Sequence, residues 1–143
     1  MHPRLALLPF AALLIASAPP QPGAPIEVAV TNVTVAKGRI HVDICSQERF
    51  LKKDCLWSGE APATVGTTVV TVANVPPGLY AAQAFHDRNG NGKVDRALFG
   101  IPTEPIGFSN DAPVHLRPPK WADAFFRHEE KPQRITLKLR SFL

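Results

Sequence analysis

The sequence predicts an all-β fold, a single small β-sandwich of six to seven strands with one long ordered loop. Several segments alternate apolar and polar residues with a period of two, which is typical of half-buried strands. No segment shows a sustained helical period, and the 15 prolines among the 143 residues gather at the edges of the alternating segments. Short strands separated by turn signals favour a sandwich of roughly immunoglobulin size.

Residues 1–18 have the three-part layout of a secretory signal peptide. Arg4 precedes an apolar run from Leu5 to Ile15, and three small residues follow it. The run is shorter than the roughly 20 apolar residues that a spanning helix needs, and Pro9 interrupts it. We therefore predict export, with no membrane span once the signal is removed. The predicted organisation is a signal peptide (1–18), a proline-rich leader (19–25) and a β-sandwich domain (26–143).

The charge of the chain gives little reason to expect a nucleic-acid partner. The formal net charge of +4 is mild, and the basic residues are scattered without interleaved aromatic side chains. Surfaces that bind single-stranded nucleic acid combine a basic groove with stacking aromatic residues. We therefore expect no nucleic-acid binding.

The two cysteines, Cys45 and Cys55, both lie in the part of the chain that is predicted to be exported. In an oxidising compartment, such a pair at short separation predicts one disulfide that closes a small loop. A redox or metal pair would have Cys-x-x-Cys spacing, which this pair lacks. We expect the disulfide to stabilise the fold by about 2–3 kcal/mol.

The first predicted strands precede a loop. Residues 26–33 alternate apolar with small or polar side chains, and Lys37-Gly38 supplies the turn that follows. Residues 39–45 form the clearest strand in the chain, because they place aliphatic side chains on one face and charged side chains on the other. Residues 46–63 break the pattern, and we expect a loop there that the disulfide pins to the sheet.

Two further strands are predicted on either side of a proline turn. Residues 67–73 are rich in β-branched side chains, and residues 80–86 alternate again. The prolines of the intervening Pro76-Pro77-Gly78 end the first of these strands. The glycine permits the turn that starts the second.

The last third of the chain is predicted to be mostly loop. From Asp95 to about Lys120, glycines and prolines make the sequence too irregular for a helix. A loop of this length in a compact domain is usually functional or ordered by something. Residues 121–126 fit either a short strand or one helical turn. Residues 134–140 alternate cleanly and form the last predicted strand, with its three aliphatic side chains facing inward.

One stretch, HDRNGNGKVD from His86 to Asp95, carries side-chain oxygens at alternate positions with glycines between them. Calcium loops of the EF-hand type need hard oxygen donors on a sharply bent backbone. The stretch is in register with the first part of such a loop, with Gly92 at the sharp turn. The predicted metal ligands are the side chains of Asp87, Asn89, Asn91 and Asp95, the carbonyl of Lys93, and Glu104 if the chain folds back.

A tight turn without an ion is the alternative interpretation of this stretch. The last position of the calcium loop, normally a bidentate glutamate, is Leu98. Asn89-Gly90 and Asn91-Gly92 are each favoured hairpin dipeptides. If calcium binds, we expect the weak class of extracellular sites, with a Kd of roughly 10⁻⁴–10⁻³ M.

An enzyme is the alternative function, although we expect none. His86, Asp87 and Glu104 would supply the acid–base groups of a hydrolase-like site. Ser109 lacks the Gly-x-Ser-x-Gly context that presents a nucleophile, so we interpret it as a turn hydroxyl. The other histidines of the predicted domain lie far apart in the sequence and have no metal-ligand spacing.

Several blocks of the sequence together identify a family. The blocks are Val75–Ala81 (VPPGLYA), His86–Asp95 (HDRNGNGKVD), Phe99–Asn110 (FGIPTEPIGFSN), Pro118-Pro119 and Ala122–Phe126. In this order they resemble an uncharacterised family of exported bacterial proteins, domain of unknown function 2141 (DUF2141). The Pro-Gly-x-Tyr entry to a strand is similar to transthyretin-like, carboxypeptidase-regulatory-like sandwiches, which implies a prealbumin-like or immunoglobulin-like sandwich. The Asp-x-Asn-x-Asn-Gly-x-x-Asp run resembles calcium loops in the B-type repeats of bacterial surface adhesins, which implies calcium as the ion.

The resemblance and the residues lead to one expected function. We expect a non-enzymatic binding module of the bacterial cell envelope, periplasmic or secreted, with a weak calcium loop. Its expected partner is an envelope protein or a glycan. A hydrolase-like enzyme and a purely structural envelope protein are the alternatives.

Overall fold

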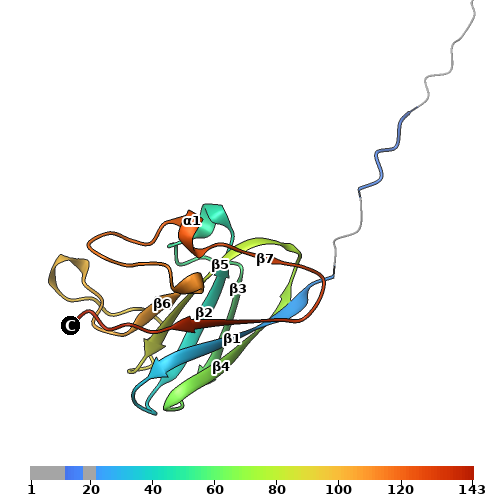
Figure 1. Ribbon diagram of the computed structural model, residues 1–143. Helices are drawn as coiled ribbons and strands as arrows, with labels where there is room; N and C mark the ends of the chain where they lie inside the picture. The colour runs from blue at the N-terminus through green and yellow to red at the C-terminus, as the bar shows by residue number, and fades with distance from the viewer. Residues whose placement is uncertain (1–11, 18–21) are drawn as a thin grey trace, which may run out of the picture.

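The computed structural model describes residues 12–17 and 22–143, and residues 22–143 form a β-sandwich of two sheets (Figure 1). The predicted fold class is therefore confirmed. Most of the predicted signal peptide and leader, residues 1–11 and 18–21, lies outside the described residues. Residues 12–17 are exposed and have no regular secondary structure. None of the helices in the described part of the chain is long and apolar enough to cross a membrane.

The first sheet has three strands in the order β4-β1-β8. The central strand, β1 (Ala24–Val33), is antiparallel to β4 (Gly66–Val75) and parallel to β8 (Gln133–Lys138). The parallel pairing places the last strand of the chain beside the first one. The strand β1 begins inside the predicted leader, earlier than the predicted start of the domain.

The second sheet has the order β3-β2-β5-β6. Its central strands are β2 (Arg39–Cys45) and β5 (Gly78–Asp87), and its edge strands are β3 (Trp57–Pro62) and β6 (Ile106–Phe108). All of these strands pair antiparallel. A further short strand, β7 (Phe126–His128), pairs with the beginning of β5. The remaining elements are single turns of helix: η1 (Gln47–Arg49), η2 (Leu98–Gly100), η3 (Ser109–Asp111) and α1 (Trp121–Ala124).

Two predicted loops contain strands, so the described chain has eight strands where six to seven were predicted. The prediction of a loop throughout residues 46–63 was wrong, because β3 forms there from a sequence, WSGEAP, in which small and polar residues hide the alternation. The strand β6 lies in the predicted irregular stretch after Asp95 and has three residues. Both are edge strands of the second sheet. Residues 121–128 form both of the predicted alternatives, a helical turn followed by a short strand.

The main hydrophobic core lies between the two sheets. It consists of the inward-facing aliphatic side chains that alternation predicts, because successive side chains of a strand point to opposite faces. In β8, Leu137 is fully buried and Ile135 is partly buried, as predicted. The fully buried members are Ile26, Val28, Val30, Ile40, Val42, Ile44, Val70, Val72, Val75, Ala82, Leu137 and Leu139.

A second, smaller core covers the outer face of β5 and β6. Ala81, Phe108, Ala112 and Ala124 are buried there, and partly buried aromatic and aliphatic side chains pack against them. The hydroxyl of Ser109 is also buried, accepting from the N–H of Ala82 (2.9 Å) and donating to the carbonyl of Ala124 (2.5 Å). Ser109 thus ties α1 to β5, which agrees with its interpretation as a structural hydroxyl.

The predicted disulfide between Cys45 and Cys55 is present. Cys45 is the last residue of β2 and is fully buried. Cys55 precedes β3, so the bridge closes the segment that carries η1. Arg49 also holds this segment, since its guanidinium donates to the Asp54 carboxylate at 2.6 Å.

Candidate functional site

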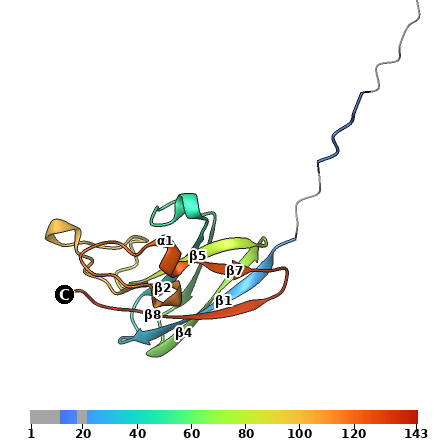
Figure 2. The ribbon, with the colours of Figure 1, turned by 45° about the horizontal axis from the view of Figure 1, so that its top comes forward.

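The candidate site is the loop from Arg88 to Glu104, which connects β5 to β6. These two strands pair as a hairpin, and the N–H of His86 donates to the carbonyl of Pro105 (3.0 Å) where the loop begins and ends. In Figures 1 and 2 the loop extends from one end of the sandwich, and the segment of residues 112–120 lies at the same end. The loop is thus the long connection of a β-hairpin whose two strands are held together where the loop begins and ends.

Asp87 organises the first turn of the loop. Its carboxylate is 3% exposed, and its two oxygens accept from the N–H groups of Asn91 (3.1 Å) and Gly92 (2.8 Å). Gly90 and Gly92 have φ values of 73° and 76°, which a side chain would strain. The glycines therefore let the backbone curl around the Asp87 carboxylate.

Asp95 closes the turn from the other side. Its carboxylate accepts from the side-chain amide of Asn89 at 2.5 Å and from that of Asn91 at 2.7 Å. The amide oxygens of the two asparagines point along the chain and accept from the N–H groups two residues further on, at 3.2 Å and 3.1 Å. One of those N–H groups belongs to Lys93. Four of the six predicted ligands, Asp87, Asn89, Asn91 and Asp95, are thus linked in one hydrogen-bond network.

Glu104 reaches this network because the chain folds back. Its carboxylate is 5% exposed and accepts from the N–H groups of Arg88 (3.0 Å) and Asp95 (3.1 Å). A second contact lies nearby, where the N–H of Thr103 donates to the carbonyl of Asp95 at 2.8 Å. Glu104 therefore holds together the two ends of the segment from Arg88 to Asp95, which is the first part of the loop.

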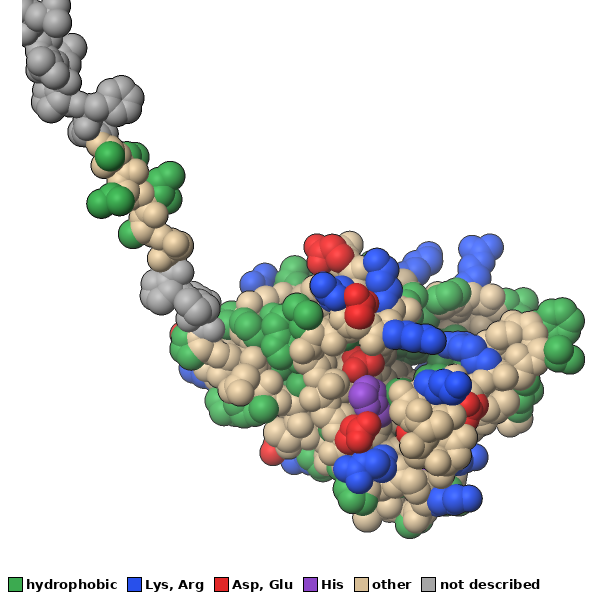
Figure 3. Space-filling view, turned by 180° about the vertical axis from the view of Figure 1, so that it is seen from behind, with side chains coloured by type: hydrophobic (Ala, Val, Ile, Leu, Met, Phe, Trp, Pro, Cys, Tyr) green, Lys and Arg blue, Asp and Glu red, His purple; other side chains and the backbone are tan. Residues whose placement is uncertain are grey.

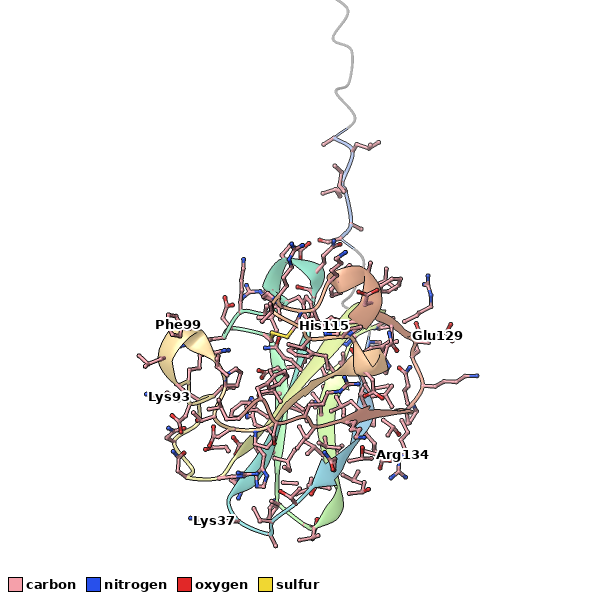
Figure 4. All side chains as sticks on the ribbon, turned by 60° about the vertical axis from the view of Figure 1, so that its left-hand side comes forward. Lys37, Lys93, Phe99, His115, Glu129 and Arg134 are labelled. Atoms are coloured by element: carbon pink, nitrogen blue, oxygen red, sulfur yellow. A yellow bond between two sulfur atoms is a disulfide. The ribbon has the colours of Figure 1, made fainter. Side chains whose placement is uncertain are left out.

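The oxygen atoms of this network retain capacity for a cation. A carboxylate or amide oxygen has two lone pairs, and each oxygen of Asp87, Asn89 and Asn91 accepts one hydrogen bond within the loop. Among the described residues, however, no group of three or more His, Cys, Asp or Glu side chains is placed to hold a metal ion. The Lys93 side chain is exposed and lies at the outer edge of the loop (Figure 4), so its charge points away from the network.

The three side chains of the alternative acid–base set all form hydrogen bonds with the backbone. The fully buried His86 donates from Nε2 to the carbonyl of Lys37 (2.6 Å), while Asp87 and Glu104 each accept from backbone N–H groups. No hydrogen bond of the described residues joins any two of these three side chains. The structure therefore gives the hydrolase-like alternative no support.

A charged cluster that the sequence did not predict lies on the outer face of β2 and β3. His41 Nε2 lies 2.8 Å from the Asp43 carboxylate, and its Nδ1 lies 3.0 Å from the Glu60 carboxylate, which also pairs with Arg39 at 3.1 Å. The hydrogen bond to Asp43, assisted by Glu60, raises the pKa of His41 although partial burial opposes the shift. Figure 3 shows charged side chains of both signs around a histidine on this face.

The sequence contained one part of this cluster. Strand alternation placed Arg39, His41 and Asp43 on the same face of the second strand. Glu60 could not be assigned to them, because its strand was predicted as a loop. Pairing of β2 with β3 sets Glu60 opposite His41.

An open groove of about 520 Å³ lies elsewhere, between Gly78 and residues 127–131. It borders the beginning of β5, whereas the candidate loop follows the end of that strand. None of the loop residues lines it. The candidate site is therefore a surface loop and not a cleft.

Comparison with known proteins gives one match. The family described as an uncharacterized protein conserved in bacteria (DUF2141) matches residues 28–136. No curated protein and no solved structure matches the chain. The matched range contains both cysteines and the whole of the candidate loop.

Proposed function

This chain belongs to the DUF2141 family, as its sequence blocks predicted, and from that premise we propose that it is a non-enzymatic binding module of the bacterial cell envelope with a calcium-binding loop. The bacterial family and the Cys45–Cys55 disulfide are consistent with a location outside the cytoplasm. The partner that we propose for the module is an envelope protein or a glycan.

The observation that carries the proposal is the convergence of Asn89 and Asn91 on the two oxygens of Asp95. The two amide groups supply partial positive charge to a carboxylate that forms no ion pair with any of the described residues. A calcium ion supplies the same charge more strongly, and the amide oxygens are ligands that it accepts. We therefore assign the ion to this network.

The ligands that we propose are the side chains of Asp87, Asn89, Asn91 and Asp95, together with the Lys93 carbonyl. We expect Glu104 to hold the loop in place and not to contact the ion directly. Both of its carboxylate oxygens already accept hydrogen bonds from backbone N–H groups. Two carboxylates around one divalent ion are few, so we expect a Kd of roughly 10⁻⁴–10⁻³ M. The bound ion would order the loop for contact with a partner.

Calcium titration by calorimetry tests this proposal on the oxidised protein, with three substitutions. Asp95→Asn removes a carboxylate with little change of shape and should abolish measurable binding. Asn91→Asp adds a carboxylate and should tighten binding by several-fold, since affinity of such loops rises with ligand charge. Asp123→Asn, an exposed carboxylate on α1, is the matched control and should leave binding unchanged.

The same titrations distinguish the structural alternative. If the wild-type protein gives no binding heat at millimolar calcium while Asp95→Asn lowers the melting temperature, the network only completes the fold. An Asn91→Asp variant that binds no more tightly than the wild type would also contradict the ligand set. A thermal melt with and without chelator provides the second readout.

A further inference from the structure

The outermost turn of the loop, Leu98-Phe99, presents two large apolar side chains to solvent. Leu98 is 82% exposed and Phe99 is 98% exposed. Single exposed apolar residues are common on protein surfaces, but two adjacent ones that contact so little of their own protein are not needed for folding. Figure 4 shows Phe99 at the far edge of the loop, beyond the body of the sandwich. We call this feature the apolar tip.

The backbone holds the apolar tip in a defined and costly conformation. Phe99 has φ 62°, a left-handed value that is unusual for a bulky residue, and the following Gly100 has φ 72°. The turn is closed by the N–H of Ala97, which donates to the carbonyl of Ile101 at 2.8 Å, and by the guanidinium of Arg96, which donates to the carbonyl of Gly100 at 2.8 Å. A strained residue that gains no packing in return points to a role outside the fold.

Exposed positive charge lies on the same loop as the apolar tip and on the segment of residues 112–120 at the same end of the molecule. Between residues 88 and 120 the exposed charged side chains are Lys93, Arg96, Arg117, Lys120 and the single acid Asp111. The acids of the loop itself are buried or partly buried in the hydrogen-bond network. Figure 3 shows hydrophobic atoms at the end of the molecule and Lys and Arg side chains gathered beside them.

The neighbouring segment adds to the same surface. Leu116 is fully exposed and adjoins Arg117, and residues 112–120 lie at the same end as the loop in Figures 1 and 2. The pattern of apolar side chains flanked by basic ones is therefore repeated on two adjacent loops. Such a surface is complementary to a lipid bilayer with anionic headgroups, in which a layer of negative charge covers an apolar interior.

We propose that the apolar tip and its basic neighbours dock the protein peripherally on an anionic phospholipid bilayer, with Leu98 and Phe99 entering the interface. A protein partner fits less well, because a stable protein interface buries about 800 Å² on each side, and a convex tip of two side chains offers far less. The basic side chains attract the anionic headgroups, and the aromatic ring is suited to the interfacial region. This docking does not require calcium in the neighbouring network.

Vesicle sedimentation with the full, oxidised chain tests the proposal in the presence of chelator. The vesicles are phosphatidylcholine with and without phosphatidylglycerol. Wild type should bind the anionic vesicles, and Leu98→Ser/Phe99→Ser should lower the partition coefficient roughly ten-fold or more. Lys93→Gln and Arg117→Gln should each lower it about five-fold, from the attraction per basic residue. Leu79→Ser, an exposed leucine at the opposite end of β5, is the matched control.

A second readout locates the inserted residue. Phe99→Trp should be quenched by brominated lipid chains above the background of the two native tryptophans, whereas Leu79→Trp should not. Because the apolar N-terminal run can also contact lipid, equal binding of wild type and the double serine variant would overturn the proposal. Equal quenching of the two introduced tryptophans would do so as well. Absence of wild-type binding to anionic vesicles would overturn it too.

Discussion

His41 lies between two carboxylates that raise the pKa of its imidazole. Both of its ring nitrogens lie within hydrogen-bond distance of carboxylates, those of Asp43 and Glu60. The Asp43 hydrogen bond is the largest cause that raises its pKa, and the charged imidazole is the form that these partners stabilise. A group whose folded pKa lies above its unfolded value stabilises the fold fully below the unfolded pKa. That contribution is lost as the pH rises through the folded pKa.

A His41→Gln substitution should therefore be more destabilising in mild acid than in mild base. At pH 5.5 we expect a loss of about 1 kcal/mol in the free energy of unfolding, because a partly exposed ion pair is worth about that much. At pH 8.5 the loss should be smaller, since the stabilisation by the charged imidazole falls as the pH rises towards and through the raised folded pKa of His41. Urea unfolding at both pH values measures the difference. His115→Gln, at an exposed histidine, is the control, and an equal loss at both pH values would contradict the assignment.

Among the elements, the edge strands close the two sides of the sandwich through glycines. A Cβ on Gly59 of β3 would lie 2.6 Å from the carbonyl oxygen of Thr71 in β4. A Cβ on Gly107 of β6 would lie 2.5 Å from the carbonyl oxygen of Lys138 in β8. Each glycine thus lets an edge of one sheet approach an edge of the other. On the side of Gly107, Ile106 and Arg140 also exchange two backbone hydrogen bonds.

A Gly59→Ala substitution should destabilise the protein by about 1–3 kcal/mol, the usual cost of overpacking. The added methyl meets backbone, which cannot rotate away as a side chain can. Ser58→Ala, the exposed neighbour on the same strand, is the matched control and should change the free energy of unfolding by less than about 0.5 kcal/mol. Chemical denaturation measures both. If the two variants have the same free energy of unfolding, the close approach of Gly59 to the β4 backbone does not contribute to stability.

At the scale of the whole molecule, the disulfide joins the sheets to the layer outside them. Cys45 lies at the end of β2, and the bridged segment carries Phe50, which packs against the second core. The aromatic ring of Phe50 contacts both Phe108 and Trp121 edge-on. The outer layer is therefore attached covalently as well as by packing.

Removal of the disulfide should lower the free energy of unfolding by about 2–3 kcal/mol, as expected for closure of a loop of this size. The Cys45→Ala/Cys55→Ala variant and the reduced wild type should show similar losses in urea unfolding. The variant itself provides the control, because reductant should not change its unfolding midpoint. A wild-type midpoint that is the same with and without reductant would show that packing alone holds the segment.

Local pattern predicted the fold class and some of the strands, whereas the metal ligands in the candidate loop stay a prediction. The spacing of Asp87, Asn89, Asn91 and Asp95 in the sequence placed them together on one tightly bent loop, and the structure links them by hydrogen bonds. The same reasoning left Glu104 conditional, since its approach depends on the return of the chain to β6. The strand of residues 39–45 was predicted with its observed bounds because two faces of opposite character leave little ambiguity. The strand β3 was missed because an edge strand of small residues shows no such contrast.

Local sequence patterns were sufficient to predict the all-β class, the inward face of the principal strands, the disulfide and the bend of the Asp87 loop. Each of these depends on residues that are close in the chain, where side-chain period and turn chemistry act directly. The tertiary structure alone decided the parallel pairing of β1 with β8, the closure of the sheet edges at Gly59 and Gly107, the contact of His41 with Glu60 and the exposure of the apolar tip. These features join residues that are distant in the chain or depend on what covers a side chain, and the free energy that selects them arises only when the sheets pack.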